Sequence, residues 1–343
     1  MDSAGEATAE DTGLGFAPVA GVTYSNETSA MFGTAAVLFY KPPFTERRIS
    51  QVTLAVAYSV RAQLVATAYA DLFGFDDRVS VHAALNFLYY PDSFFGIGSD
   101  TQISDEERFV PRNLEARLRP LYQIIDDVFV GPVMRLESIS VLETQSGGRL
   151  ASGEVFGADG GFDFSFGIAA VYDTRDNTLY PRRGSSFEFW TLVSDPVLGS
   201  DFRMSRSLVD LRHYIPLGPP DHVLALQGVG RFTTGTVPFF ALGRLGGERL
   251  LRGHFNGRFR DGQLLALQGE YRFPLVWRLG MVGFAGVGNV APRLRSFRLR
   301  DSKYGVGAGL RLNLAKKERI HLRADLAWGG DEAGAYVNVG EAF

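Results

Sequence analysis

The chain has 343 residues, a formal net charge of −3 and no cysteine, which excludes disulfides and thiol chemistry. This charge gives no basic field that would attract nucleic acid, and no uninterrupted Lys/Arg block indicates a membrane-surface patch. Forty glycines and 27 phenylalanines favour β-structure, because glycine weakens helix interiors and phenylalanine suits half-buried pleated surfaces. No window holds the ~18 apolar residues that a membrane-spanning helix requires.

The N-terminal stretch MDSAGEATAEDTG, residues 1–13, is small and acidic. It lacks the charged and then apolar run of a secretory signal, so either a signal has been removed or none was used. We expect residues 1–13 to form a short tail and residues 14–343 to form one domain.

A two-residue period runs along nearly the whole chain. In QVTLAVAYSV, residues 51–60, one set of alternate positions is apolar and the other is small or polar. The segments KYGVGAGLRLNL and IHLRADLAW repeat the pattern, with charged residues opposite the apolar set. The pattern predicts sixteen strands, at residues 14–24, 29–40, 49–60, 62–74, 77–90, 108–123, 128–142, 162–173, 184–194, 202–215, 222–233, 262–274, 278–290, 302–314, 319–329 and 335–343.

The predicted fold class is all-β: a 16-stranded antiparallel transmembrane β-barrel whose polar face lines the lumen. Strands of ~9–11 residues in even number are typical of such barrels. Short connections alternate with long ones at 91–107, 143–161 and 234–261, as periplasmic turns alternate with outer loops. The alternative is a soluble sandwich that buries two apolar faces against each other. Pro120 lies inside the sixth predicted strand, and proline lacks the N–H that a central strand donates to its neighbour. The boundary of this strand is therefore weakly defined by the sequence.

A Gly- and Arg-rich stretch between the eleventh and twelfth predicted strands contains Leu251, Arg252, Gly253, His254 and Phe255. This stretch resembles the arginine–glycine–aromatic tip of the sixth outer loop in the outer-membrane protein assembly barrels, the superfamily of BamA, TamA and the two-partner secretion transporters. Position along the chain and motif agree independently.

A second piece of the resemblance lies between the eighth and ninth predicted strands. It contains Asp173, Arg175, Asp176, Pro181 and Gly184, and it is similar to the family's periplasmic turn at that place.

Two further pieces follow in the family's order, so that the resemblance covers residues 14–343. GEYRF, residues 269–273, resembles the twelfth strand, and the ending from Tyr336 resembles the last strand. The resemblance implies that Tyr336, Val339 and Phe343 belong to a C-terminal assembly signal.

The resemblance also implies that a long loop six folds into the lumen, where its arginine meets inward-facing acids. Glu270 is inward by parity with Arg272, so an Arg252–Glu270 contact is expected. Two departures weaken this expectation. Gly286 stands where the family usually has an aspartate, so a second acidic partner is missing, and His254 replaces the usual aromatic or apolar residue, which would soften the tip's attachment.

As a member of this family the protein would be an integral barrel of the bacterial outer membrane, surrounded by its lipid bilayer. A lateral gate would lie at the seam between the first and last strands, where we place Pro18, Gly21, Val22, Val337 and Gly340. An open edge can pair with an incoming strand, which would insert or export polypeptide clients. The alternative is a seam that never opens, in a passive or structural pore plugged by loop six.

The family's assembly and secretion members carry periplasmic polypeptide-binding modules ahead of the barrel. Here only the periplasmic tail, residues 1–13, precedes the first strand. Either the chain was truncated or it is a barrel-only relative; we favour the latter, in which accessory proteins replace the missing modules.

Catalytic motifs are absent from the sequence. The five histidines show no H-x-x-H or H-E-x-x-H spacing, and no G-x-S-x-G elbow occurs. We therefore expect neither an enzyme nor a metal or cofactor site, and no nucleic-acid partner.

Overall fold

The computed structural model describes residues 13–40, 49–316 and 318–343. The predicted tail therefore lies outside the described residues except for Gly13. No helix in the described part of the chain is long and apolar enough to cross a membrane.

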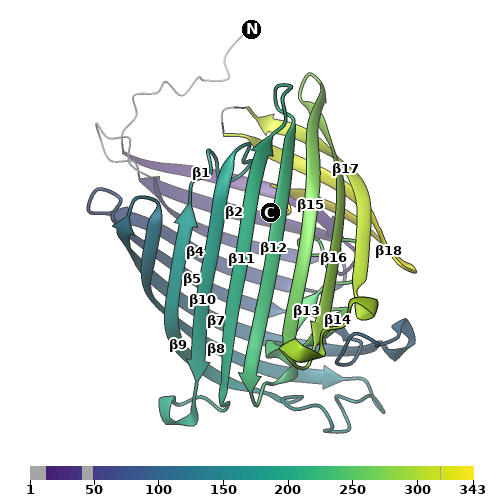
Figure 1. Cartoon of the computed structure of the whole chain (residues 1–343). Coiled ribbons are helices and arrows are strands. Elements are labelled where there is room, and N and C mark those ends of the chain that lie inside the picture. Colours follow the sequence, from purple (N-terminus) through teal and green to yellow (C-terminus); the bar gives the residue numbers. More distant parts are fainter. Residues whose placement is uncertain (1–12, 41–48, 317) are drawn as a thin grey trace.

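Sixteen long strands of the described chain form one closed antiparallel barrel (Figure 1). Each strand pairs with its neighbours in chain order, and β1 also pairs with β19, which closes the sheet. The prediction of an all-β chain that forms a 16-stranded antiparallel barrel is confirmed. The barrel strands are β1 Leu14–Ser25, β2 Ser29–Tyr40, β3 Ser50–Ser59, β4 Leu64–Gly74, β5 Val79–Tyr89, β7 Glu107–Ile125, β8 Val128–Thr144, β9 Gly160–Asp173, β10 Gly184–Ser194, β11 Met204–Pro216, β12 Val223–Gly235, β15 Gln263–Val276, β16 Leu279–Ala291, β17 Lys303–Ala315, β18 Ile320–Gly329 and β19 Glu332–Val339.

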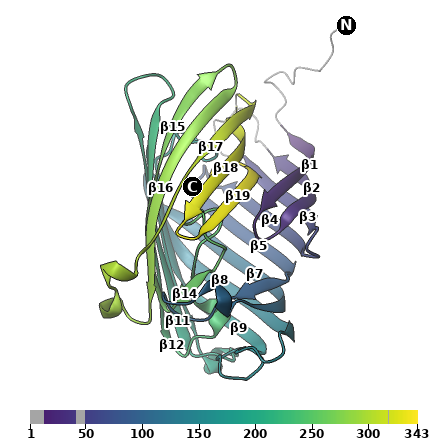
Figure 2. The same cartoon turned by 90° about the vertical axis from the view of Figure 1, so that its right-hand side faces the viewer.

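Short elements lie in the long connections at one end of the barrel (Figure 2). The strand β6 pairs with β7, and β13 pairs with β14 as a two-stranded ribbon between β12 and β15. These elements are β6 Asp92–Phe94, β13 Gly243–Leu245, β14 Phe259–Asp261 and the 3-10 turns η1 Ile103–Asp105, η2 Pro196–Leu198, η3 Phe239–Ala241, η4 Leu294–Ser296 and η5 Leu299–Asp301.

The two faces of the wall differ in the way that the two-residue period predicts. On β18, Leu326 and Trp328 are exposed, whereas Arg323 and Asp325, at the other set of alternate positions, are buried. On β3 the apolar residues Leu54, Val56 and Tyr58 are likewise exposed. A wall with apolar side chains outside and charged side chains inside suits a lipid surrounding.

The last strand ends earlier than predicted, at Val339 instead of residue 343. Gly340 has a left-handed φ of 90°, and its N–H donates to the His321 carbonyl at 2.8 Å, so the chain leaves the sheet there. Phe343 is consequently buried against Tyr214 and Val223. Parity along the strand could not reveal this turn.

The proline-containing sixth strand is continuous, as predicted, but its ladder to β8 is interrupted. Leu118 pairs with Met134 and Tyr122 with Val130, and no register partner is assigned between them. Conserving this register places Pro120 opposite Pro132, so neither side offers an N–H at that point. The backbone of β7 approaches β8 closely here.

We expect Gly131→Ala to destabilise the barrel by about 1–3 kcal/mol through overpacking. A Cβ at Gly131 would lie 2.0 Å from the Pro120 carbonyl oxygen, a backbone atom that no rotamer change can move. The measurement is the urea midpoint of the heat-modifiable folded form. Gly283→Ala is the control, because nothing lies within 4 Å of its added Cβ. Equal midpoints for the two variants would contradict the prediction.

Candidate functional site at the tip of loop six and the seam

Loop six, residues 236–262, connects β12 to β15, and its tip has a backbone that few residues can adopt. Leu251 and Gly253 have positive φ values of 59° and 108°. A Cβ at Gly253 would lie 2.6 Å from the Trp328 carbonyl carbon, so glycine alone fits against β18. The Gly253 N–H donates to the Tyr336 hydroxyl at 3.2 Å. The tip is thus packed directly against β18 and β19.

Arg252 is buried at the tip, with 2% of its surface exposed. Its guanidinium pairs with Glu270 on β15, the contact that the sequence predicted. It also pairs with Asp325 on β18, with Nη1 and Oδ2 2.6 Å apart, and lies 3.5 Å over the Phe284 ring. The expectation that a second acidic partner is missing is therefore wrong, because β18 supplies it.

Gly286, the departure from the family's aspartate, faces the same tip. A Cβ there would lie 3.4 Å from Leu251 Cδ1 and 3.1 Å from Gln268 Cβ. Leu251 belongs to a buried apolar cluster with Leu245 and Leu264. An apolar side chain from the loop thus packs beside the position where a carboxylate would otherwise point.

The two acids that hold Arg252 are themselves paired with other arginines. Arg272 Nε lies 2.9 Å from Glu270 Oε2, and Arg311 Nη1 lies 2.5 Å from Asp325 Oδ1. These side chains are all buried, so each charge depends on its partners for compensation. The two-residue period places Arg272, Asp325 and Arg311 on the inward faces of their strands. It did not predict that Asp325 and Arg311 belong to the Arg252 site.

His254 attaches the tip instead of softening its attachment, so that expectation is also wrong. Its Nε2 lies 3.0 Å from the Tyr304 carbonyl, and its Nδ1 lies 3.2 Å from the Glu332 carboxylate. Both neighbours offer acceptor oxygens at these contacts, so a ring nitrogen that carries a proton donates to the oxygen it faces.

Loop six also contacts both edges of the seam. On the β19 side, Glu332 accepts from Phe255 N–H at 3.2 Å and lies 3.1 Å from Arg258 Nε. On the β1 side, Glu27 in the β1–β2 turn accepts from Asn256 N–H at 2.7 Å. Burial raises the pKa of the Glu27 carboxyl above its usual range. Adjacent loop residues therefore touch the first hairpin and the last strand.

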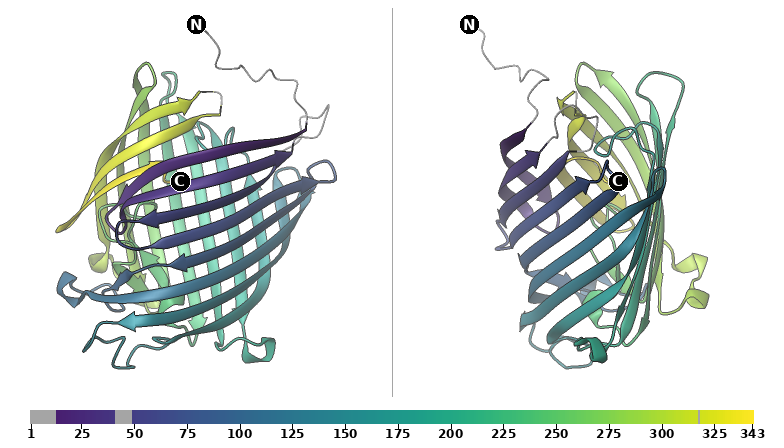
Figure 3. Two further views of the ribbon diagram at one scale, coloured as in Figure 1. Left: turned by 180° about the vertical axis from the view of Figure 1, so that it is seen from behind. Right: turned by 90° about the vertical axis from the view of Figure 1, so that its left-hand side faces the viewer.

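The seam itself is paired over a very short length (Figure 3). β1 pairs with β2 over its whole length, from Leu14 to Ser25. With β19 it has one registered residue pair, Tyr24 with Val337. The Asn26 side chain adds two hydrogen bonds to β19. Its Nδ2 donates to the Ala333 carbonyl at 2.6 Å, and its Oδ1 accepts from the Ala335 N–H at 3.1 Å.

The predicted seam residues occupy this region unevenly. Val337 is at the registered pair, opposite Tyr24 and not opposite Val22. Pro18, Gly21 and Val22 pair with β2, and among the described residues they have no registered partner on β19. Gly340 lies beyond the last strand.

The predicted periplasmic turn joins β9 to β10 and is held by its own acids. Asp173 binds the Arg175 guanidinium through two bonds of 2.9 and 2.7 Å. Asp176 accepts from Arg319 Nη1 at 2.6 Å, which ties the turn to the β17–β18 connection. At Gly184, φ is 100° and a Cβ would meet the Thr174 carbonyl at 2.3 Å. Pro181 is buried within the turn.

The residues grouped as a C-terminal signal lie on different faces. Val339 is exposed on the outside, whereas Tyr336 and Phe343 are buried. The Phe343 ring lies 5.6 Å from Arg272 Cζ, beneath the network that holds Arg252. Within the described ranges, no group of three or more His, Cys, Asp or Glu side chains is placed to hold a metal ion.

Comparisons with known proteins extend over the whole barrel. Residues 143–343 match the family model of the Omp85 superfamily domain. Similar solved structures include BamA from Haemophilus ducreyi lacking POTRA domains 1–3, with a TM-score of 0.66 and 14% identity over 96% of this chain and 70% of that one. CdiB from Acinetobacter baumannii has a TM-score of 0.62 and 11% identity over 96% of this chain and 60% of that one.

CdiB from Escherichia coli has a TM-score of 0.61 and 12% identity over 97% of this chain and 63% of that one. This chain thus spans less than two thirds of either CdiB chain, and at these identities the likeness concerns the fold alone. No curated protein sequence matches the chain.

We expect Arg252→Gln to destabilise the barrel by about 3–5 kcal/mol, because it leaves Glu270 and Asp325 buried without their shared partner. The measurement is again the urea midpoint. Arg249→Gln is the matched control in the same loop, since Arg249 is exposed and lies 3.9 Å from its nearest carboxylate. The double variant with Glu270→Gln should recover part of the loss; a fully additive loss would refute the network.

Proposed function

Because the chain belongs to the Omp85 superfamily, we propose that it inserts or exports polypeptides through a lateral opening between its first and last strands. Family and fold support an outer-membrane barrel of the protein-translocation and insertion type. The observation that carries the finer proposal is the single registered pair between β1 and β19.

The energetics of this seam favour exchange with an incoming strand. Most of the β1 edge that faces β19 has no registered partner there. Unsatisfied backbone groups are costly in a bilayer, so a seam that lacks pairs has little to lose by opening. A client strand that supplied N–H and C=O groups along β1 would satisfy that edge by β-augmentation.

Loop six directs the opening to the seam. We infer that the loop occupies the lumen, where Arg252 joins β15 to β18 through its two carboxylates and the tip donates to Tyr336 on β19. Strands β15 to β19 then move as one braced wall. Two neighbouring strands separate most easily where the Arg252 ion pairs do not brace them and where they share the fewest backbone pairs. In this barrel those strands are β1 and β19.

The second candidate is a passive or structural barrel plugged by loop six. The depth at which Arg252 and Leu251 are buried favours it, because a firmly attached plug would also keep the lumen shut. Either role needs no catalytic group, and we propose that the protein is not an enzyme. Accessory proteins that deliver clients belong to the first role.

The test locks the seam with a disulfide between Tyr24→Cys and Val337→Cys, in a chain that has no other cysteine. The folding rate of an unfolded barrel client is measured in liposomes that contain the oxidised or the reduced protein. We expect oxidation to abolish the acceleration and reduction to restore it, because a closed seam offers no edge.

A second disulfide, between Phe32→Cys and Tyr58→Cys, is the matched control. These two residues are a registered pair on β2 and β3, and both are exposed. This second disulfide should leave the acceleration unchanged. Equal acceleration by the oxidised and reduced seam variants would exclude the lateral route. Absence of acceleration in every state would favour the passive barrel.

A further inference from the structure

The connection between β16 and β17, residues 292–302, carries an unusual concentration of positive charge. From Pro292 to Lys303 the chain has four arginines and one lysine against the single acid Asp301, a net charge of 5 − 1 = +4 in a protein whose total is −3. The triplet Arg-Leu-Arg occurs twice, at 293–295 and 298–300, and each copy enters a 3-10 turn, η4 or η5.

The arginines of this loop are free to bind something else. Arg300 lies 3.4 Å from Asp301, and both are on the surface. Within the described parts of the chain, Arg293, Arg295 and Arg298 have no carboxylate within ion-pair distance. Between the arginines, Leu294 and Leu299 are 61% and 95% exposed. Exposed leucines flanked by arginines are typical of segments that sit at a membrane interface.

The loop borders a groove in the outer face of the barrel wall. Phe297, Arg298 and Leu299 line a cavity of about 510 Å³ together with the wall residues Phe232, Leu265 and Leu267. The Asn289 side chain donates to the Arg298 carbonyl at 2.9 Å, which holds the loop against β16. A volume of this size falls in the range of ~300–1,000 Å³ that small-molecule sites occupy.

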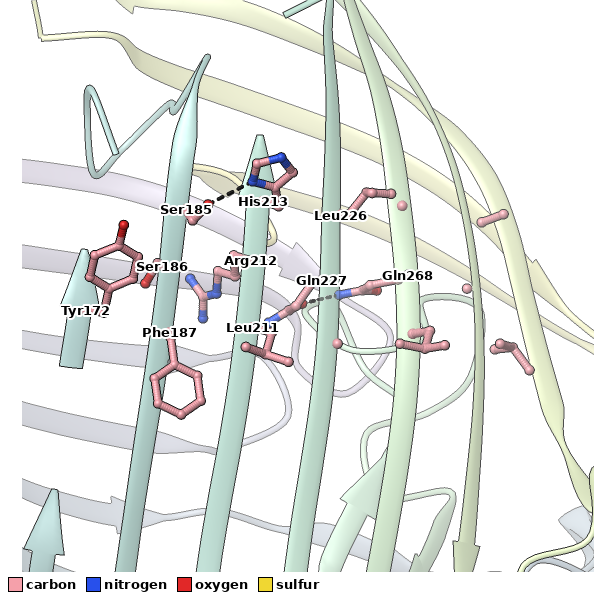
Figure 4. Close-up of a pocket in the computed structure, with 16 residues that line it drawn as sticks. Tyr172, Ser185, Ser186, Phe187, Leu211, Arg212, His213, Leu226, Gln227 and Gln268 are labelled. Carbon is pink, nitrogen blue, oxygen red and sulfur yellow. Dashed lines mark hydrogen bonds between the residues drawn. The ribbon is translucent and has the colours of Figure 1, made fainter. Parts of the chain in front are cut away.

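The groove continues along the wall beyond the loop. A second cavity, of about 850 Å³, shares Leu211, Gly228 and Leu267 with the first. It runs toward the other end of β11, where His213 Nδ1 and Ser185 Oγ are 2.8 Å apart (Figure 4). The two hollows adjoin and are mostly apolar, so they form a shallow apolar groove in the outer wall that starts at the basic loop.

We propose that this loop and groove bind a phosphate-bearing lipid of the outer leaflet, with an acyl chain in the groove and the phosphate on Arg298 and its neighbours. The occupant must be apolar along the wall and anionic at the loop. Arginine suits phosphate, because its planar fork donates two bonds at once. Basic residues beside an apolar surface are a known combination for anionic lipids.

The leaflet follows from the position of the loop. Residues 292–302 have the same strand parity as the long connections at 90–106, 145–159 and 236–262, which family topology places outside the cell. An acidic soluble protein could reach the arginines but could not enter a groove that faces lipid. The inference rests on the outer-membrane location of the proposed function and on nothing about clients or the seam.

The test uses the purified full chain in a neutral detergent, titrated with bis-phosphorylated lipid A or with its dephosphorylated form, and native mass spectrometry measures the bound lipid. We expect the phosphorylated form to bind about tenfold more tightly, and Arg298→Gln to remove that preference. Arg203→Gln is the matched control, because Arg203 is also an exposed arginine of an outer loop and is paired with Asp195. It should bind as the parent does.

Gly228→Leu tests the groove independently of charge. The added side chain would grow from the groove floor beside Leu267 and should weaken binding of both lipids. Heat-modifiability establishes that each variant is folded. Equal binding of both lipids by the parent, or equal losses in Arg298→Gln and Arg203→Gln, would overturn the proposal. No client is present, so this result is separate from the seam experiment.

Discussion

The structure depends most on one buried guanidinium. Arg252 lies between Glu270 on β15 and Asp325 on β18, two strands that are not neighbours in the sheet. It can pair with both carboxylates because loop six positions it between these strands. Taking three charges out of water is expensive, so this arrangement is poorly explained as a source of stability. Its effect is positional. It fixes the tip of the loop against β15, β16 and β18, and further pairs with Arg272 and Arg311 extend the brace.

The contacts that hold the barrel wall differ between the strands near Arg252 and the closing edge. One part of the barrel wall is held by buried ion pairs, whereas the closing edge has the Tyr24–Val337 pair and the two Asn26 side-chain hydrogen bonds. Loop six also spans this edge, because Asn256 contacts Glu27 while its neighbour Phe255 contacts Glu332. Parting the strands must break one of these two contacts. Adjacent backbone amides of the loop thus contact both edges of the seam.

The sequence predicted the strands and the inward parity of Glu270 and Asp325, because both depend on a local two-residue period. It could not predict that Asp325 completes the Arg252 site, since that requires knowing which strands the loop tip reaches. The same limit applies to His254, whose partners lie 50 and 78 residues further along the chain. The turn at Gly340 was missed because Phe343 keeps the parity of Val339, although Glu341 interrupts the apolar set between them.

The basic loop was missed for a different reason. A search for uninterrupted Lys/Arg runs passes over Arg-Leu-Arg triplets, and only the folded chain shows Phe297 and Leu299 lining a groove in the wall. That groove lies on β11, β12, β15 and β16, and it shares β15 with the two strands that Arg252 joins, β15 and β18. A lipid held there would lie away from β1. The proposed lipid and the Arg252 ion pairs would thus both act on β15, away from the short pairing between β1 and β19.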